Sequence, residues 1–312
     1  MPDRMADQAF SRNRRRKRRF DDDDDLPVFA KRDPHRQRLQ PDDAFDDVDG
    51  LPEGDRWSTW DQSSPSERGP RPHPGWLIID LGATDTELGV LKTGKEADVF
   101  LLRRAVPGTD RSCLLAAKRY RAAENRLFHR DVEYLDGRRV RESRDNRAMA
   151  RRTATGRAII AQQWAKAELA ALASLHQAGV AVPYPVQVTG TELLLEFIGE
   201  PDGTAAPRLA EVRPRGADLA DLWNQLVAAL CAMASLGLAH GDLSAYNVLV
   251  HRGRPVLIDL PQVIDVIAHP RGPEFLDRDA ANIARWFTAR GLDGGGVRPA
   301  ELGALLRAEA RV

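Results

Sequence analysis

The sequence contains little cysteine and no long hydrophobic run. Its two cysteines, Cys113 and Cys231, stand among apolar residues, with no CxxC pair and no histidine at metal-ligand spacing. This arrangement argues against a disulfide framework or a zinc site and is typical of free thiols in a reducing compartment. The chain also lacks a run of about eighteen apolar residues and an apolar signal core. We therefore expect a cytoplasmic protein without a membrane partner.

The sequence also has no net charge, because 46 Lys and Arg residues balance 46 Asp and Glu residues. The charges are nevertheless segregated: residues 12–19 are nearly all basic, and residues 21–25 are all aspartate. Proline, serine, aspartate and arginine dominate residues 1–75, a composition that predicts a disordered tail. The basic run could contact nucleic acid, including a ribosome-related partner. It could also be a solvated tail partly neutralised by the aspartates, which is the usual behaviour of such runs and the interpretation that we favour.

Beyond residue 76 the hydrophobic pattern predicts strands followed by helices. Apolar residues recur at helical spacing from Leu219 to Met233, in a helix that we expect to end at Gly237. A strand-rich part followed by a helix-rich part is typical of an α+β protein. We expect two lobes, residues 76–198 and 199–312. The expected strands cover residues 87–91, 97–103, 113–120 and 193–198, and the other expected helices cover residues 155–177 and 274–289.

The most informative segment runs from His240 to Asp259. Asp242 precedes Asn247 by five residues; an apolar triplet, a polar linker, a second apolar triplet and Asp259 follow. The two triplets predict a β-hairpin with Asn247 and Asp259 opposite each other. Their side-chain oxygens suit a hard cation such as Mg²⁺. With Asp242 orienting an attacking hydroxyl, this is the layout of a phosphoryl-transfer site. The alternative is a loop in which Asp and Asn only cap the backbone.

A lysine and a glutamate stand where charged residues are unexpected. Lys118 shares a strand face with Leu114 and Ala116, since alternate residues of a strand point the same way. Glu168 lies on the apolar stripe of its helix. A buried carboxylate is costly unless it is paired, so we predict an ion pair between Lys118 and Glu168. The alternative is that Lys118 extends to the surface and Glu168 lies at the edge of the stripe.

The segment from Gly89 to Glu96 almost matches a Walker A loop. That loop needs a serine or threonine after its lysine, where this chain has Glu96, and it should lead into a helix. The residues that follow, 97–102, predict a strand. We therefore expect a turn between two strands that covers phosphates with its backbone, where Gly94 permits close approach.

Several motifs of the sequence occur in the order found in one family. They are Thr93-Gly94-Lys95-Glu96-Ala97, Trp164-Ala165-x-x-Glu168, His240-Gly241-Asp242-Leu243-Ser244-x-Tyr246-Asn247, Ile258-Asp259-x-x-Gln262, and Phe275-Leu276-x-Arg278-Asp279 with Asn282-Ile283. Over roughly residues 76–290 the chain thus resembles the RIO family of atypical serine/threonine kinases. It is most similar to the subfamily whose phosphate loop reads Ser/Thr-Gly-Lys-Glu-Ala.

The resemblance implies a reduced, two-lobed protein-kinase-like fold that uses ATP with Mg²⁺, or alternatively Mn²⁺. It implies transfer of the γ-phosphate of ATP to a protein hydroxyl, including autophosphorylation. Asp242 would be the catalytic acid, and Asn247 and Asp259 would be the metal ligands; Asp259 accepts phosphate transiently in some members. Eukaryotic and archaeal members assist small-ribosomal-subunit maturation, although the N-terminal tail here is unlike theirs. The expected nucleotide-binding residues are Thr93, Gly94, Lys95, Glu96, Lys118, Glu168, Glu196 and Ile198.

Three other functions use similar residues. A conventional protein kinase is disfavoured because no Phe-Gly follows Asp259 and no Ala-Pro-Glu occurs beyond it. A small-molecule kinase of the aminoglycoside-phosphotransferase type shares the HGD loop, but the segments 94–97 and 258–262 argue against it. An ATPase-type assembly switch would need the same site residues, so the sequence leaves it open.

Residues 121–152 form an arginine-rich stretch with few apolar residues. We expect a mobile insertion there. Both of its ends are joined to elements of the expected nucleotide site, so a hydroxyl within it could reach the γ-phosphate at high effective concentration. We predict that any autophosphorylation falls on Ser143 or Thr153. The alternative is a passive surface loop.

Overall fold

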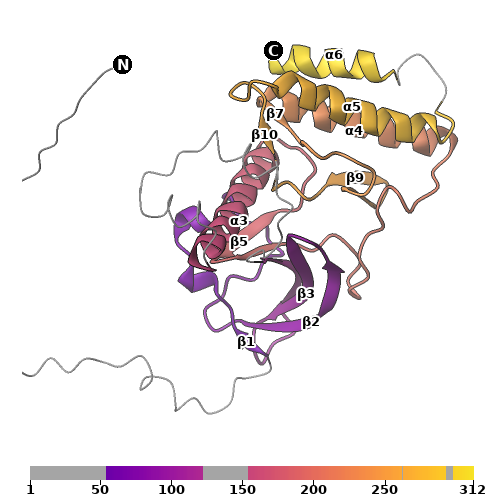
Figure 1. Ribbon diagram of the computed structural model, residues 1–312. Helices are drawn as coiled ribbons and strands as arrows, with labels where there is room; N and C mark the ends of the chain where they lie inside the picture. Colours follow the sequence, from indigo (N-terminus) through magenta and orange to yellow (C-terminus); the bar gives the residue numbers. More distant parts are fainter. Residues whose placement is uncertain (1–53, 122–153, 262, 293–297) are drawn as a thin grey trace, which may run out of the picture. The chain divides into compact units, whose positions relative to one another are not determined.

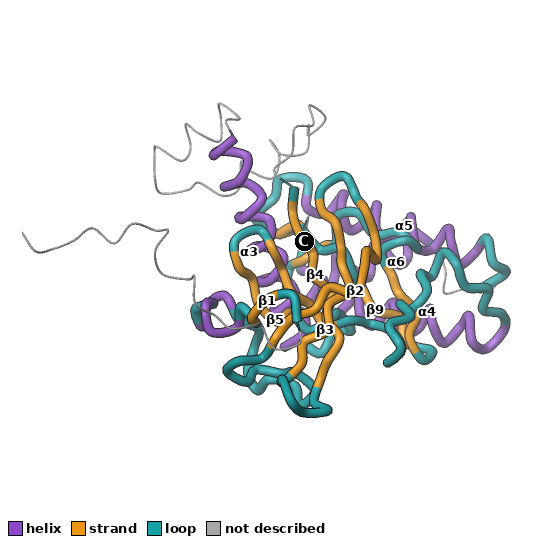
Figure 2. The backbone as a smooth tube through the Cα atoms, turned by 90° about the horizontal axis from the view of Figure 1, so that it is seen from below, coloured by secondary structure: helices purple, strands orange, loops and turns teal. Residues whose placement is uncertain are grey.

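A six-stranded antiparallel sheet forms the first part of the fold. The computed structural model describes residues 54–121, 154–261, 263–292 and 298–312. The strands lie in the order β1-β2-β3-β4-β6-β5 (Figures 1 and 2). The expected strands at 87–91, 97–103, 113–120 and 193–198 are confirmed, with shifted ends. The bounds are β1 Arg56–Trp57, β2 Thr84–Thr93, β3 Ala97–Ala105, β4 Ser112–Tyr120, β5 Pro185–Thr189 and β6 Glu192–Glu196.

Helix α3, Ala154–Gln177, packs against strands β4, β5 and β6 of this sheet. It agrees within one residue with the predicted helix at 155–177. The helix ends where Gly179 adopts a left-handed φ of 78°, which favours glycine. The side chains that it buries recur at steps of three and four residues, as expected for one face of a helix. They are Ala161, Ala165, Glu168, Leu169, Leu172 and Leu175.

The segment from residue 54 to residue 83 covers the other face of the sheet. Trp60, Leu77 and Ile78 are buried there in one cluster with Leu102 and Leu115. This segment contains β1 and two short 3-10 helices, η1 at Trp60–Gln62 and η2 at Pro65–Glu67. The expectation of a disordered tail up to residue 75 is therefore wrong for residues 54–75. The prediction of disorder relied on the polar composition of this segment and gave no weight to its two tryptophans, Trp57 and Trp60. Residues 1–53 and their charge runs lie outside the described residues.

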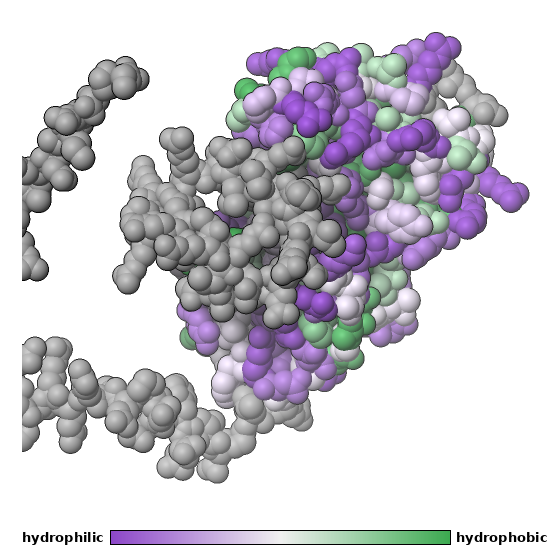
Figure 3. Space-filling view, viewed as in Figure 1, coloured by the Kyte–Doolittle hydropathy of each residue, from purple (hydrophilic) through white to green (hydrophobic). Residues whose placement is uncertain are grey.

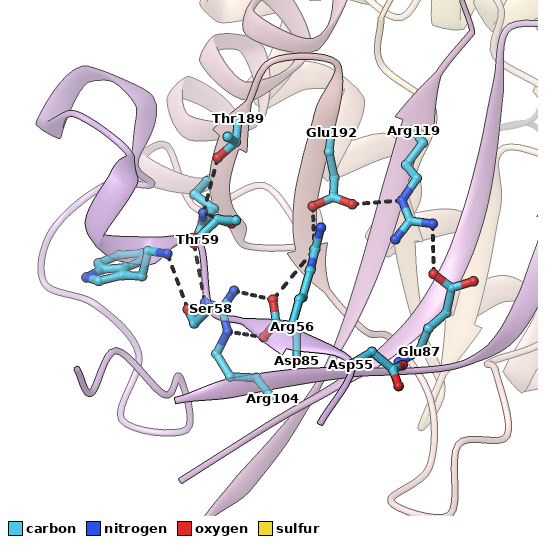
Figure 4. A network of polar contacts seen from close by, with 12 residues as sticks. Asp55, Arg56, Ser58, Thr59, Asp85, Glu87, Arg104, Arg119, Thr189 and Glu192 are labelled. Atoms are coloured by element: carbon cyan, nitrogen blue, oxygen red, sulfur yellow. Dashed lines mark hydrogen bonds and ion pairs between the residues drawn. The ribbon is translucent and has the colours of Figure 1, made fainter. Parts of the chain in front are cut away.

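A buried arginine fixes one end of the sheet. Arg104 on β3 is fully buried, and its Nε and Nη2 donate to the two carboxylate oxygens of Asp85 on β2 at 2.7 and 3.0 Å. Its Nη1 also donates to Gln187 Oε1 on β5, at 3.3 Å. Figure 4 shows how Arg56 and Glu192 extend these contacts toward Arg119. Since each buried charge has a partner, the network holds β1 to β6 in one arrangement.

Helices α4, α5 and α6 pack together in the second part of the fold, with a β8–β9 hairpin between them and the sheet (Figure 1). The predicted helices at 219–237 and 274–289 are confirmed as α4 and α5, but α6 was not predicted, because its three leucines form too short a pattern. On the face drawn in Figure 3, hydrophilic residues predominate over these helices. The bounds are α4 Gly216–Ser235, β7 Leu238–Ala239, β8 Val248–His251, β9 Arg254–Leu257, β10 Ile264–Asp265, α5 Gly272–Thr288 and α6 Pro299–Ala310.

The α+β class is thus confirmed. The described residues belong to one compact unit, Gly50–Val312, and the boundary that we predict after residue 198 falls inside it, just beyond β6. Cys113 is buried and Cys231 half-buried, and both are free thiols. None of the described helices is both long and apolar enough to cross a bilayer. The expected insertion at 121–152, with Ser143, and Thr153 beyond it, lies outside the described residues except for Arg121.

Candidate active site

A cavity of about 670 Å³ lies where the β2–β3 turn, β4, α3 and the β8–β9 hairpin meet. Nine of the eleven predicted site residues line it, although they come from parts of the sequence more than 160 residues apart. Thr93 and Asn247 are not among the lining residues. The predicted residues on its wall are Gly94, Lys95, Glu96, Lys118, Glu168, Glu196, Ile198, Asp242 and Asp259.

Lys118 on β4 lies between two carboxylates. Its Nζ is 2.8 Å from Glu168 Oε1 and 2.8 Å from Asp259 Oδ1. The predicted Lys118–Glu168 ion pair is present, and the surface-exposed alternative is wrong, since Lys118 is only 7% exposed. Burial alone would lower the pKa of Lys118, but the two carboxylates raise it above its ordinary value. The ammonium is therefore held charged at the inner wall of the cavity.

Glu168 has two further partners that the sequence did not predict. The Tyr120 hydroxyl donates to Glu168 Oε2, and the backbone N–H of Leu260 donates to Oε1 at 3.0 Å. Burial and the neighbouring carboxylate of Glu168 raise the pKa of Tyr120 well above its ordinary value, so the phenol keeps its proton. Tyr120 lies two residues after Lys118, on the same strand face. That spacing is the signal that could have found it.

Asp259 adopts a left-handed backbone conformation, with φ 64°. Such a φ is uncommon outside glycine, and in non-glycine residues it concentrates at functional sites. Burial would raise the pKa of this carboxyl, but Lys118, helped by Lys92 with its Nζ 3.9 Å from Oδ2, lowers the pKa below its ordinary value. The bend after β9 therefore presents an ionised carboxylate to the cavity.

The prediction that Asn247 and Asp259 lie opposite each other is wrong by one position. Val248 pairs with Leu257 across the hairpin, and Ile258 N donates to Asn247 O at 3.0 Å. Asn247 therefore faces Ile258, and Asp259 follows at the bend. The Asn247 Nδ2 group donates to Asp242 O at 2.9 Å, which leaves Oδ1 as the side-chain acceptor. Asn247 thus fixes the backbone of the residue that we expect to orient the hydroxyl.

A buried aspartate of α5 anchors the loop that contains Asp242. Asp279 is 2% exposed, and its two carboxylate oxygens accept from Gly241 N at 2.9 Å and Leu243 N at 3.1 Å. Burial raises the pKa of this carboxyl, while the charge of His240 and the two N–H groups act against that rise. His240 Nε2 in turn lies 3.1 Å from Ile258 O. These contacts hold the loop while leaving the Asp242 side chain exposed at the cavity.

The turn between β2 and β3 closes the cavity on one side. Gly94 N donates to Ala97 O at 3.0 Å, and a Cβ on residue 94 would lie only 2.8 Å from that oxygen. The tight turn therefore requires glycine. The chain continues into β3, which confirms that this segment is not a Walker A loop. Thr93, the last residue of β2, pairs with Asp98, and its side chain bonds to the Asp98 carboxylate, so it is engaged across the turn and is not a lining residue.

Glu196 and Ile198 lie where the chain leaves the sheet. One oxygen of the Glu196 carboxylate, Oε2, accepts from Tyr184 N at 3.0 Å, just before β5. Ile198 O accepts from Ala206 N at 3.0 Å.

Comparison with known proteins agrees with this arrangement. A model of the RIO domain matches residues 114–298, more than half of the chain. The chain belongs to the RIO family. Among its relatives, the RIO-type serine/threonine-protein kinase Rio1 of Haloferax volcanii is 33% identical over 221 residues, which cover 71% of this chain and 70% of that protein.

Two eukaryotic RIO proteins are also similar. The serine/threonine-protein kinase RIO3 of Homo sapiens is 30% identical over 227 residues, which cover 70% of this chain and 41% of that protein. The serine/threonine-protein kinase RIO1 of Caenorhabditis elegans is 32% identical over 206 residues, covering 65% of this chain and 37% of that protein. The RIO chain thus spans less than half the length of these relatives. Their names identify the family as one of serine/threonine-protein kinases, and this chain is a member of it.

Proposed function

We propose that this RIO chain transfers the γ-phosphate of ATP to a serine or threonine hydroxyl of a protein. The observation that supports the proposal is the convergence of Lys118, Asp242 and Asp259 on one cavity, each held by buried partners. Asp242 orients the attacking hydroxyl and accepts its proton as the hydroxyl oxygen bonds to phosphorus and ADP leaves. Lys118 neutralises phosphate charge at the inner wall.

The donor set fits Mg²⁺ with phosphates as additional ligands. In the parts of the chain that the structure describes, no group of three or more His, Cys, Asp or Glu residues could hold a metal by itself. Asn247 and Asp259 supply oxygens, and Mg²⁺ commonly binds one or two protein ligands together with substrate phosphates. When bound, the cation neutralises charge on the transferred group. Mn²⁺ would take the same ligands.

The variant Asp242→Asn tests the assignment. We expect it to bind nucleotide with an affinity close to that of the parent, because Asp242 acts on the hydroxyl, and to lower phosphate transfer at least ~100-fold. Nucleotide binding is measured by calorimetry, and transfer by following labelled phosphate into protein. Transfer at the parental rate would exclude Asp242 as the catalytic acid.

The destination of the phosphate separates the proposal from its alternatives. Label on a serine or threonine of a protein supports a protein kinase, label only in water supports an ATPase switch, and label on a small molecule supports a small-molecule kinase. Autophosphorylation on Ser143 or Thr153 stays a prediction, which mass spectrometry of the ATP-treated protein tests. Phosphate only elsewhere in the chain, or none, would contradict it.

A further inference from the structure

Five arginines surround the loop that contains Asp242, and we call them the arginine rim: Arg208, Arg213, Arg278, Arg285 and Arg290. Two of them bond directly to the loop. Arg208 Nη1 donates to Tyr246 O at 2.6 Å, and Arg278 Nη2 donates to Gly241 O. Their guanidinium groups are therefore fixed beside the residue that orients the acceptor hydroxyl.

The other three arginines lie one contact further out. Arg285 Nη2 donates to Asn282 Oδ1 at 2.6 Å, and Asn282 Nδ2 donates to Leu243 O at 3.2 Å. Arg213 Nη1 donates to Ala210 O at 3.2 Å, in a segment that bonds to the loop through Ala210 N and Ala245 O.

The fifth arginine, Arg290, lies close to Arg213 and Tyr246. Its guanidinium stacks 3.8 Å from the Trp286 ring centroid. Burial and the charge of Arg213 lower its pKa, whereas Tyr246 acts in the opposite direction, so Arg290 lies near both. Its Nε is buried without a hydrogen-bond partner in the described part of the chain.

None of the five arginines of the rim has a carboxylate within 4.0 Å among the described residues. The groups that accept hydrogen bonds from them in the described part of the chain are backbone carbonyls and the Asn282 amide. Other arginines of the same helical region are paired: Arg271 with Glu274, and Arg307 with Asp277. Five arginines without a carboxylate partner thus lie around the catalytic loop.

Such a group of charges is suited to an anionic partner. Arginine forms its strongest bonds with carboxylates and phosphates, because its planar group can donate two parallel N–H bonds. Lys118 lines the cavity, whereas the rim bonds to the loop of Asp242 and only Arg208 of the rim is a lining residue, so the rim is placed to contact residues that flank an acceptor hydroxyl. Tyr246, 62% exposed in the same loop, offers an aromatic surface beside them.

We propose that the arginine rim selects protein substrates in which acidic residues flank the acceptor serine or threonine. This inference rests on the proposed kinase function and adds the chemical class of its substrate. A carboxylate on either side of the acceptor would pair with Arg213, Arg285 or Arg290 while the hydroxyl meets Asp242. Basic flanks would be repelled by the same charges.

The test compares three peptides with the full chain, ATP and Mg²⁺. Each contains one serine, flanked by aspartates, by asparagines or by lysines. We expect kcat/KM to be at least ~10-fold higher for the aspartate peptide than for the asparagine peptide, and lowest for the lysine peptide. In the double variant Arg213→Gln/Arg285→Gln the ratio should approach one. The control Arg311→Gln, which removes an exposed arginine at the end of α6, should keep the parental ratio.

Other results of this experiment would overturn either the substrate preference or the kinase function, and they can be told apart. Equal kcat/KM for the three peptides would overturn the inference while leaving the kinase function intact. ATP turnover without label on any peptide or protein would overturn the proposed function itself. If the double variant loses affinity for a single-stranded RNA oligonucleotide but keeps the parental peptide ratio, the rim binds nucleic acid and the inference is wrong. Added salt should reduce the parental ratio, since partly exposed charges are screened.

Discussion

Lys118 Nζ lies 2.8 Å from Asp259 Oδ1, which joins the lysine of β4 directly to the carboxylate at the end of the β8–β9 hairpin. The two residues are 141 positions apart in the sequence. The same ammonium also bonds to Glu168, so one cation connects the sheet, helix α3 and the hairpin. The arrangement of the cavity wall thus depends on the bonds of one ammonium group to two carboxylates. Mutation of any of the three residues tests this dependence.

We expect Lys118→Met to destabilise the fold and to abolish nucleotide binding. Glu168 is 1% exposed and would keep only Tyr120 and Leu260 N as partners. Removing one partner of a buried ion pair costs about 3–5 kcal/mol. Urea unfolding measures the loss. The double variant Lys118→Met/Glu168→Gln should recover part of it, because it removes the unpaired charge. Equal stability of the single variant and the parent would show that the pair contributes nothing.

Asp259→Asn should reduce the Mg²⁺-dependent part of nucleotide affinity. An amide supplies one neutral oxygen in place of an ionised carboxylate, and hard cations prefer the charged ligand. Calorimetric titration with nucleotide, in the presence and absence of Mg²⁺, separates the two parts. Asn247→Ala should also reduce the Mg²⁺-dependent affinity. It should in addition loosen the backbone at Asp242, because it removes the bond from Asn247 Nδ2 to Asp242 O at 2.9 Å. If Mg²⁺ strengthens binding equally in the parent and both variants, these residues are not metal ligands.

Asp279→Asn should loosen the catalytic loop while leaving the bonds of Lys118 to Glu168 and Asp259 in place. The amide can accept only one of the two N–H bonds from Gly241 and Leu243, and a buried donor left unpaired costs about 1–3 kcal/mol. We expect faster hydrogen exchange at those two amides and lower activity. Asp277→Asn is the matched control, since this exposed neighbour bonds to Arg307 instead. Unchanged exchange in the Asp279 variant would show that other contacts hold the loop.

The sequence was most informative where a charged residue interrupted an apolar pattern. Glu168 stands on the buried stripe of α3, and pairing it with Lys118 placed two distant segments together correctly. Asp279 gave the same signal, three residues after Leu276 on the stripe of α5, but its partners are backbone N–H groups that no pattern of residue types reveals. The pair Asp85 and Arg104 depends on the register of β2 and β3. That register includes two bulges, so residue alternation could not have set it.

The remaining errors have local causes. The one-position error at Asn247 and Asp259 arose at the hairpin turn. His251 pairs with Arg254, and Arg252 and Gly253 form a two-residue turn with φ of 52° and 73°, so the register differs by one from that expected for a linker of residues 251–255. Residues 54–75 were expected to be disordered because their average composition is polar. Their folding depends instead on a few anchors, of which Trp60 is the most buried. Averages over a segment therefore missed contacts made by single side chains.

An ion pair between Glu67 of η2 and Lys166 of α3 also anchors this segment. Glu67 Oε1 lies 2.8 Å from Lys166 Nζ, and Lys166 is two residues from Glu168. The Lys166 ammonium, together with the N–H and hydroxyl of Ser64, lowers the pKa of Glu67 from 4.5 to about 2. The pair thus joins the segment that covers the sheet to helix α3, whose Glu168 bonds to Lys118.

Because the pKa of Glu67 is lower in the folded state, its contribution to the free energy of unfolding is complete above pH 4.5 and is lost as the pH falls toward about 2. At pH 7 we expect Glu67→Gln to cost roughly 0.2–1 kcal/mol, since both side chains are partly exposed. Unfolding of the parent, Glu67→Gln, Lys166→Gln and the double variant between pH 7 and pH 3 gives the coupling energy at each pH. That energy should decline below pH 4.5. A coupling energy that stays constant down to pH 3, or is absent at pH 7, would show that the charge of Glu67 does not hold η2 to α3.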